Sequence, residues 1–250
     1  MTKILMFLFV LTSFLPACGG GTTGEYDRLK NGDLEGEELV AALEDFEVRH
    51  PGHFYAKVDL GTYYLARGEE GRARDYLRRA EACAEKAGTP PDGENYPAIM
   101  YGALGQICLN RGEYRQALEY AERAIEAAGE AAKDYLVLKS RVLVAQQDYA
   151  GALAIFDGLF AADALSTAED SESGDILAYL FLLAQAERTA EAAALLNRYF
   201  ETGAFFPSLG SFAAMVYRAA GETERAAYAA YLEQEYRSGY ADGADQGPGA

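Results

Sequence analysis

Two segments of this chain, residues 60–80 and 104–124, repeat one pattern of apolar and small residues. Each segment begins with Leu-Gly, reaches Arg-Gly seven residues later, and places an alanine five residues after that second glycine. Apolar residues at helical spacing on either side of a glycine indicate two helices joined by a tight turn. Because one such pair cannot bury its apolar faces alone, the pattern predicts several pairs packed one on the next.

The pattern assigns a role to each of its positions. The residues expected inside the two pairs are Leu60, Tyr64, Leu77 and Ala80 in the first copy and Leu104, Cys108, Ala121 and Ala124 in the second. Small residues at Gly61 and Ala73 let the two helix backbones approach closely, and Gly68 supplies the turn. The matching residues of the second copy are Gly105, Ala117 and Gly112.

This spacing resembles the tetratricopeptide repeat (TPR), a unit of two antiparallel helices and about 34 residues. Three less regular copies follow at 136–159, 176–200 and 209–236, and Gln147 and Glu187 replace the turn glycine in the first two of them. Segment 39–51 resembles the second helix of a degenerate unit. No copy carries the Trp often seen early in the first helix. The resemblance implies an all-α, TPR-like α-solenoid, a right-handed superhelix of five to six helix pairs over residues 25–236.

Polar and turn-forming residues separate the copies at 87–97 and 166–175, where we expect loops. The second loop is rich in carboxylates but lacks the residue spacing of a calcium-binding loop. We therefore interpret it as a solvated loop, with Asp175 capping the next helix. The last residues, 237–250, show no apolar period and are expected to form a disordered tail.

The N-terminus has the layout of a secretory signal peptide. Lys3 precedes an apolar run, 4–15, which is shorter than the roughly 20 residues of a membrane span. The alternative, a buried N-terminal helix, lacks a polar face. Residues 15–18, Leu-Pro-Ala-Cys, resemble the lipobox of bacterial lipoproteins, which implies removal of residues 1–17 and acylation of Cys18. Residues 18–24 would then form a flexible glycine-rich tether, whose formal match to G-x-G-x-x-G is weak because no strand precedes it.

A TPR solenoid implies a concave groove lined by the first helix of each pair. Projecting the repeat register onto the sequence, we expect the residues that face this groove to be Tyr55, Asp59, Thr62, Gln106, Asn110, Arg141, Phe181, Gln185, Phe212, Met215 and Arg218. Such a groove suits an extended peptide or a helix of another protein. The alternatives are that these side chains are only solvated, or that Phe181 and Met215 belong to the core. The Lys and Asn pattern by which some TPR domains clamp a C-terminal carboxylate is absent.

Charge narrows the possible partners. The chain has 22 Lys and Arg against 39 Asp and Glu, a net charge of −17, so no nucleic-acid partner is expected. An acidic surface favours solubility or a basic partner. Besides Cys18, the cysteines are Cys83 and Cys108, and the sequence leaves open whether they form a disulfide.

The sequence carries no P-loop, G-x-S-x-G or H-E-x-x-H motif and no metal-ligand spacing. His50 and His53 flank Pro51-Gly52 between two helices, where exposed loop side chains are expected and a metal-binding pair is the alternative. We therefore predict no enzymatic activity, no cofactor and no metal site.

These observations predict a lipid-anchored, extracytoplasmic TPR adaptor. Segment 42–68 resembles the TPR lipoprotein of the outer-membrane β-barrel assembly machinery, and the pilotins that assist secretin assembly are similar in build. Both resemblances imply a protein or peptide partner in the bacterial cell envelope, on the periplasmic or outer-membrane side. The alternative is an accessory lipoprotein that delivers a small-molecule ligand to a transporter.

Overall fold

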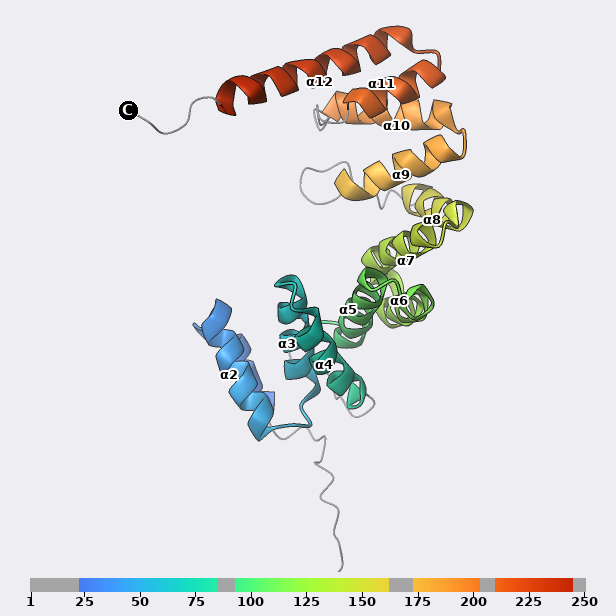
Figure 1. Cartoon of the computed structure of the whole chain (residues 1–250). Helices are drawn as coiled ribbons and strands as arrows, with labels where there is room; N and C mark the ends of the chain where they lie inside the picture. Colours follow the sequence, from blue (N-terminus) through green and yellow to red (C-terminus); the bar gives the residue numbers. More distant parts are fainter. Residues whose placement is uncertain (1–22, 85–92, 162–172, 203–209, 245–250) are drawn as a thin grey trace, which may run out of the picture. The chain divides into compact units, whose positions relative to one another are not determined.

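In the computed structural model, which describes residues 23–84, 93–161, 173–202 and 210–244, every regular element is helical (Figure 1). Twelve α-helices lie within these ranges, and each odd-numbered helix contacts the even-numbered helix that follows it. The helices are α1 (Thr23–Lys30), α2 (Gly36–Arg49), α3 (Phe54–Ala66), α4 (Glu70–Glu81), α5 (Tyr96–Asn110), α6 (Tyr114–Ala128), α7 (Lys133–Ala145), α8 (Tyr149–Ala161), α9 (Ser173–Gln185), α10 (Thr189–Thr202), α11 (Gly210–Ala219) and α12 (Thr223–Ala244). A short 3-10 helix, Gly129–Ala131, follows α6.

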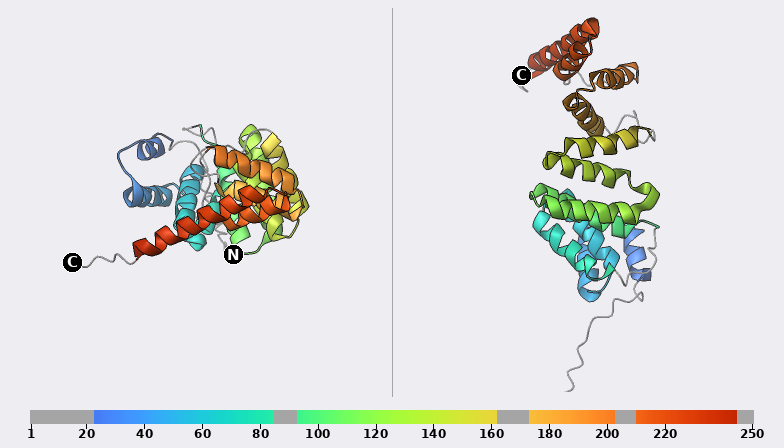
Figure 2. Two further views of the ribbon diagram at one scale, coloured as in Figure 1. Left: turned by 90° about the horizontal axis from the view of Figure 1, so that it is seen from above. Right: turned by 90° about the vertical axis from the view of Figure 1, so that its right-hand side faces the viewer.

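The chain divides into two compact units, an N-terminal unit (Met1–Gly129) and a C-terminal unit (Glu130–Ala250). In the N-terminal unit the pairs α3/α4 and α5/α6 pack together through α3, α4 and α5. In the C-terminal unit α8 contacts α9, and α10 contacts α11. Figure 2 shows the paired helices of each unit from two further directions. Each unit is thus a stack of helix pairs, as the repeat pattern predicts.

The turn inside a helix pair has the same geometry five times. Gly68, Gly112, Gln147, Glu187 and Gly221 all have positive φ, between 57° and 82°. The residue after each of them donates its N–H to the carbonyl five residues earlier, as from Glu69 to Tyr64 and from Arg188 to Leu183, with N···O distances of 2.8 and 2.9 Å. This is the Schellman arrangement that ends a helix at a left-handed residue. The two non-glycine residues therefore occupy the predicted turn positions.

Close packing inside the pairs follows the predicted positions. Leu60, Leu77 and Ala73 are fully buried. A Cβ added at Gly61 would lie 2.5 Å from Leu77 Cγ, which is closer than real Cβ contacts come. Gly61 is therefore required by the approach of α3 to α4, as the sequence predicts. At the start of α8, Tyr149 is 38% exposed and lies outside the core.

The second helix, α2, is fixed to α3 and α4 by buried charge. Lys57 on α3 is almost completely buried, and its Nζ lies 3.3 Å from Glu47 Oε1 on α2. The same Lys57 donates to the carbonyl oxygens of Pro51 and His53. Arg79 on α4 also pairs with Glu47. Glu47 pairs with both cations and Lys57 also donates to the loop carbonyls, so neither of the two buried charges, Lys57 and Glu47, is left unpaired.

The ends of the helical region differ from the sequence prediction. Helix α1 begins at Thr23, inside the predicted tether 18–24, and α12 continues to Ala244, inside the predicted tail 237–250. Once a helix has formed, adding residues to its end costs little, and no proline interrupts α12 within these bounds. Asp175 lies in the first turn of α9 and does not precede it as a cap.

The predicted signal peptide, Cys18 and most of both predicted loops lie outside the described residues. Among the helices that the structure describes, none is both long and apolar enough to cross a membrane.

Candidate functional site

The predicted groove residues fall at equivalent places in consecutive pairs. Thr62, Gln106, Arg141, Phe181 and Met215 each stand eleven residues before the alanine that packs the second helix of their pair. They lie on α3, α5, α7, α9 and α11, the first helices of those pairs. We call these five residues the groove column: Thr62 and Gln106 belong to the N-terminal unit, and Arg141, Phe181 and Met215 belong to the C-terminal unit.

In the N-terminal unit the groove face of α3 is covered by α1. Tyr26 on α1 is fully buried, and its hydroxyl donates to Asp59 Oδ2 at 2.5 Å and lies 2.9 Å from the Tyr96 hydroxyl. Lys30 Nζ, also on α1, lies 3.1 Å from Asp59 Oδ1. Tyr55 retains only 6% of its surface. The prediction that Tyr55 and Asp59 line an open groove is therefore wrong, because α1 fills that space.

Burial under α1 changes the ionisation of the covered groups. Burial raises the pKa of Asp59, and its hydrogen bond from Tyr26 and the charge of Lys30 oppose that shift. The pKa of Tyr26 is raised, first by burial and then by the Asp59 carboxylate, so this tyrosine stays protonated and can donate.

The two histidines also belong to this covered region. The His53 ring lies 4.7 Å from the Tyr26 ring and 4.9 Å from the Phe46 ring, between centroids. Its Nδ1 accepts from the Ala56 N–H and so caps α3. Burial lowers the pKa of His53 to about 4, and the charge of Lys57 adds to that effect. His50 Nε2 lies 3.3 Å from Glu25 Oε2 on α1. Neither histidine is the exposed loop side chain that the sequence predicts.

The remaining groove residues of the N-terminal unit are polar and hydrogen-bonded. The Thr62 hydroxyl donates to the Val58 carbonyl of its own helix at 3.1 Å. Gln106 donates to Asn110 Oδ1 at 2.6 Å, and Asn110 donates in turn to Glu70 Oε1 at 2.6 Å. Asn110 and Gln106 thus lie at the surface, where they form hydrogen bonds with other residues of the protein.

In the C-terminal unit the groove column is exposed, and two of its three residues, Phe181 and Met215, are apolar. Phe181 on α9 is 40% exposed and Met215 on α11 is 51% exposed, so the alternative that they are core residues is wrong. The Phe181 ring meets the Tyr149 ring edge-on at 6.3 Å between centroids. Arg141, Gln185 and Arg218 are exposed as well, whereas Phe212 is partly buried against the core.

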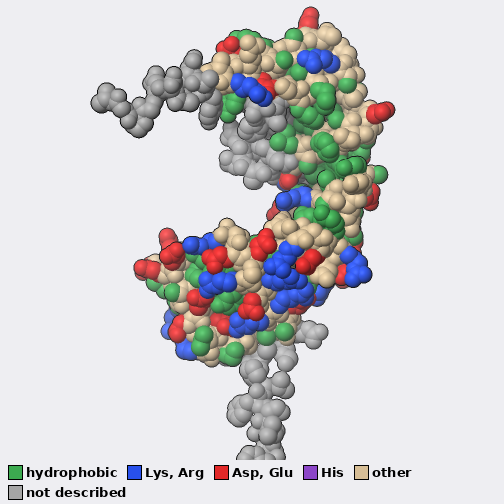
Figure 3. Space-filling model, in the orientation of Figure 1, with side chains coloured by type: hydrophobic (Ala, Val, Ile, Leu, Met, Phe, Trp, Pro, Cys, Tyr) green, Lys and Arg blue, Asp and Glu red, His purple; other side chains and the backbone are tan. Residues whose placement is uncertain are grey.

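The two units therefore present different surfaces. On the face in Figure 3, charged side chains of both signs are interspersed over the N-terminal unit, and hydrophobic side chains gather on the C-terminal unit. Large apolar side chains are costly to leave in water. Exposed apolar side chains at equivalent repeat positions are typical of a surface that binds another molecule.

Metal-ligating clusters and reactive thiols are the other groups that could support chemistry. In the described part of the chain, no three His, Cys, Asp or Glu side chains converge as metal ligands would. Cys83 and Cys108 are both buried, and no disulfide joins them. Burial, followed by the charge of Glu113, raises the pKa of Cys108, which disfavours the reactive thiolate.

Sequence reasoning missed Tyr26 as part of this region. Its two hydrogen-bond partners, Asp59 and Tyr96, lie 33 and 70 residues away, and no local pattern encodes contacts of that range. The only local signal is that Tyr26 and Lys30 share one face of α1, four residues apart.

Comparison with solved structures agrees with the helix-pair architecture. The chain is similar to YrrB, described as a TPR protein with an unusual peptide-binding site, with a TM-score of 0.59 and 16% sequence identity. The match covers 77% of this chain and 91% of YrrB. The fold is a TPR-like α-solenoid. No family model matches the chain, and no curated protein matches it in sequence.

Proposed function

We propose that this protein is a lipid-anchored TPR adaptor of the bacterial cell envelope, which binds an extended segment of a partner protein on the first-helix face of its C-terminal unit. The observation that carries the proposal is the exposure of Phe181 and Met215 at equivalent positions of α9 and α11. A TPR-like solenoid with such a surface supports protein or peptide binding, and YrrB, a solved structure that it resembles, is described as a TPR protein with a peptide-binding site.

The energetics favour this face over that of the N-terminal unit. Covering the exposed parts of Phe181 and Met215 would contribute about 1 kcal/mol each. Arg141 is exposed on α7, and Arg218 is exposed on α11, the helix that carries Met215. Both supply donors for carbonyl or carboxylate groups of a peptide. In the N-terminal unit, by contrast, Tyr26 and Lys30 already occupy the groove side of α3.

Photo-crosslinking tests the binding face. A benzophenone amino acid replaces Phe181 or Met215 in intact cells that produce the chain, and Tyr231, 53% exposed on α12, is the matched control position. We expect a discrete adduct with one partner from both groove positions and none from position 231. Adducts that are the same at all three positions, or absent from positions 181 and 215, would overturn the proposed face.

The anchor is tested separately. The apolar run 4–15 and the lipobox-like residues 15–18 support acylation of Cys18. We expect the chain to incorporate labelled palmitate and to sediment with membranes, and the Cys18→Ala variant to do neither. A Cys18→Ala chain that fractionates with membranes as the unchanged chain does would remove the lipid anchor from the proposal.

A further inference from the structure

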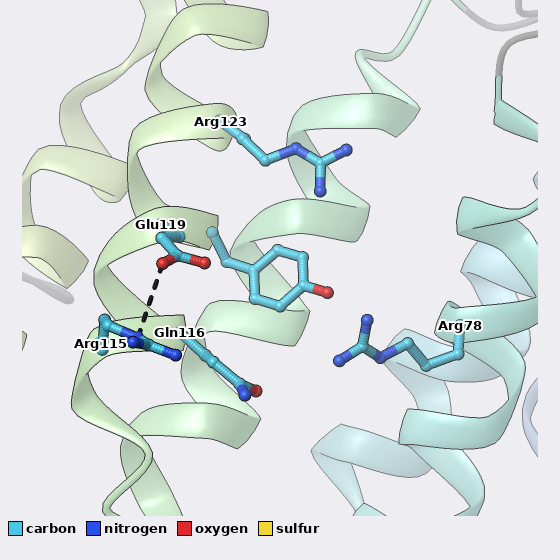
Figure 4. Close-up of a pocket in the computed structure, with 6 residues that line it drawn as sticks. Arg78, Arg115, Gln116, Glu119 and Arg123 are labelled. Atoms are coloured by element: carbon cyan, nitrogen blue, oxygen red, sulfur yellow. Dashed lines mark ion pairs between the residues drawn. The ribbon is translucent and has the colours of Figure 1, made fainter.

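Three arginines converge on a pocket in the N-terminal unit, in a chain whose net charge is −17. The pocket has a volume of about 270 Å³ and lies between α4 and α6. The side chains that line it are Arg78, Arg115, Gln116, Glu119, Tyr120 and Arg123. In Figure 4 the Arg78 guanidinium points from its helix toward the side chains that α6 contributes. This pocket is built by second helices of the pairs and is separate from the groove column.

Carboxylates neutralise the arginines only in part. Glu81 accepts from Arg123 at 2.6 Å through Oε1, and from Arg78 at 3.1 Å and the Tyr120 hydroxyl at 3.2 Å through Oε2. Both oxygens of Glu81 are thus engaged. Glu119 lies 3.8 Å from Arg115 Nε, which is an ion pair without a hydrogen bond. Three guanidinium groups face two carboxylates, and one positive charge remains.

Donor groups remain as well as charge. A guanidinium carries five N–H groups. Among the described residues, Arg78 gives a hydrogen bond from Nη1 alone, and the side chain of Arg115 is 88% exposed without a hydrogen bond. Arg123 is held in place, since its guanidinium lies 3.9 Å from the centroid of the Tyr101 ring and also donates to the Tyr101 hydroxyl. One arginine is therefore fixed and two keep donors for a ligand.

The aromatic wall does not oppose an anion. Burial raises the pKa of Tyr120 to about 12, so its hydroxyl is neutral at physiological pH. Small-molecule sites usually enclose about 300–1,000 Å³, and this pocket lies just below that range. Its size therefore suits a compact molecule with several charges and excludes a large cofactor.

We propose that this pocket binds a small oxyanion with two or more negative charges, held by Arg78, Arg115 and Arg123. Guanidinium groups match phosphate and carboxylate oxygens with paired, charge-assisted hydrogen bonds, which is why arginine clusters recognise such groups. Phosphate and carboxylate share this chemistry, and the experiment distinguishes them by using one probe of each kind.

Calorimetric titration of the purified full chain with inorganic pyrophosphate and, separately, with citrate tests the site. We expect at least one probe to bind with one-to-one stoichiometry, and its identity assigns the ligand as a phosphate or a carboxylate compound. Arg78→Gln and Arg115→Gln should each weaken binding about tenfold or more, since each removes a charge-assisted contact. Raising the salt concentration should also weaken it.

The control is Arg225→Gln. Arg225 on α12 forms an ion pair with Glu222, three positions away, as Arg78 does with Glu81. The affinity of the Arg225→Gln variant for the probe should stay within about twofold of that of the unchanged chain. Arg115 is so exposed that its substitution does not endanger folding, and circular dichroism of each variant checks this. No binding of either probe, or equal weakening by all three substitutions, overturns the proposal.

Discussion

Gln147 and Glu187 hold a backbone conformation that glycine adopts at the three equivalent turns. Their φ angles are 64° and 57°, in the left-handed region that a side chain disfavours by roughly 1–2 kcal/mol. Glycine relieves this strain but has more freedom to lose on folding. We therefore expect Gln147→Gly and Glu187→Gly each to raise the free energy of unfolding by about 0.5–1 kcal/mol, measured by urea denaturation.

The adjacent residue provides the control for that prediction. Gln146 ends α7 with a φ of −84°, in the right-handed region. Gln146→Gly should therefore destabilise the protein, because it adds flexibility without relieving strain. Equal destabilisation by Gln146→Gly and Gln147→Gly would contradict the prediction and would mean that the Gln147 side chain itself stabilises the turn.

His53 should make stability depend on pH. Its folded pKa of about 4 lies below the value of about 6.5 expected in the unfolded chain. The unfolded chain therefore binds the proton first, and the stability contributed by neutral His53 is fully present above pH 6.5 and is lost as pH falls toward 4. Between pH 7 and pH 5 we expect the free energy of unfolding to fall by about 1–2 kcal/mol from this group.

A substitution isolates that contribution from the other titrating groups. Asn95 caps α5 by accepting from the Ala98 N–H, as His53 accepts from Ala56 before α3. His53→Asn should keep the cap and remove the titration. The variant should be less stable at pH 7, where it lacks the packed ring, but its stability should change less between pH 7 and pH 5. An unchanged pH dependence in His53→Asn would show that His53 is not the group responsible.

At the level of single elements, the repeat pairs could be predicted because their signals are local. The turn at Gly68 and the close approach at Gly61 are encoded within one 21-residue segment, where spacing alone places each residue. The cover that α1 forms over α3 could not be predicted in this way, because it depends on contacts such as that of Tyr26 with Tyr96. Of the groove positions that the register predicts, Phe181, Gln185, Met215 and Arg218 are therefore exposed on α9 and α11, whereas Phe212 packs against the core and the positions under α1 are covered.

The hydroxyl of Tyr26 should stabilise the attachment of α1. Tyr26→Phe keeps the buried ring but removes the donor to Asp59 and the contact with Tyr96. We expect the free energy of unfolding to fall by about 1–3 kcal/mol, because the largely buried Asp59 carboxylate loses a hydrogen bond. Faster amide hydrogen exchange in residues 23–30 should accompany it.

The control for Tyr26 is another tyrosine without that environment. Tyr231→Phe on α12 removes an exposed hydroxyl and should change stability by less than about 0.5 kcal/mol. If Tyr26→Phe is no more costly than Tyr231→Phe, the hydroxyl network does not hold α1 in place, and the apolar contacts of the ring must do so.

At the scale of the whole molecule, the net charge of −17 acts at longer range than the ion pairs do. Pairs such as Arg72 with Glu44, at 2.7 Å, lie well within a screening length, whereas the excess carboxylates repel one another over larger separations. Salt shortens the screening length from about 30 Å at 0.01 M to about 8 Å at 0.15 M, so it removes mainly the long-range repulsion. Exposed ion pairs contribute little to the free energy of unfolding in any case, with a median of about 0–1 kcal/mol per pair.

We therefore expect the full chain to become more stable as salt rises over this range, with a higher urea midpoint, while binding of an oxyanion to the arginine pocket becomes weaker. The two responses are opposite because folding brings the excess carboxylates closer together, whereas binding brings a negative ligand to positively charged arginines. Tetramethylammonium chloride in place of sodium chloride should give the same increase in stability, which separates ionic strength from specific cation binding. A urea midpoint that falls with salt would show that the ion pairs of the N-terminal unit outweigh the repulsion, and that the acidic excess has little influence on folding.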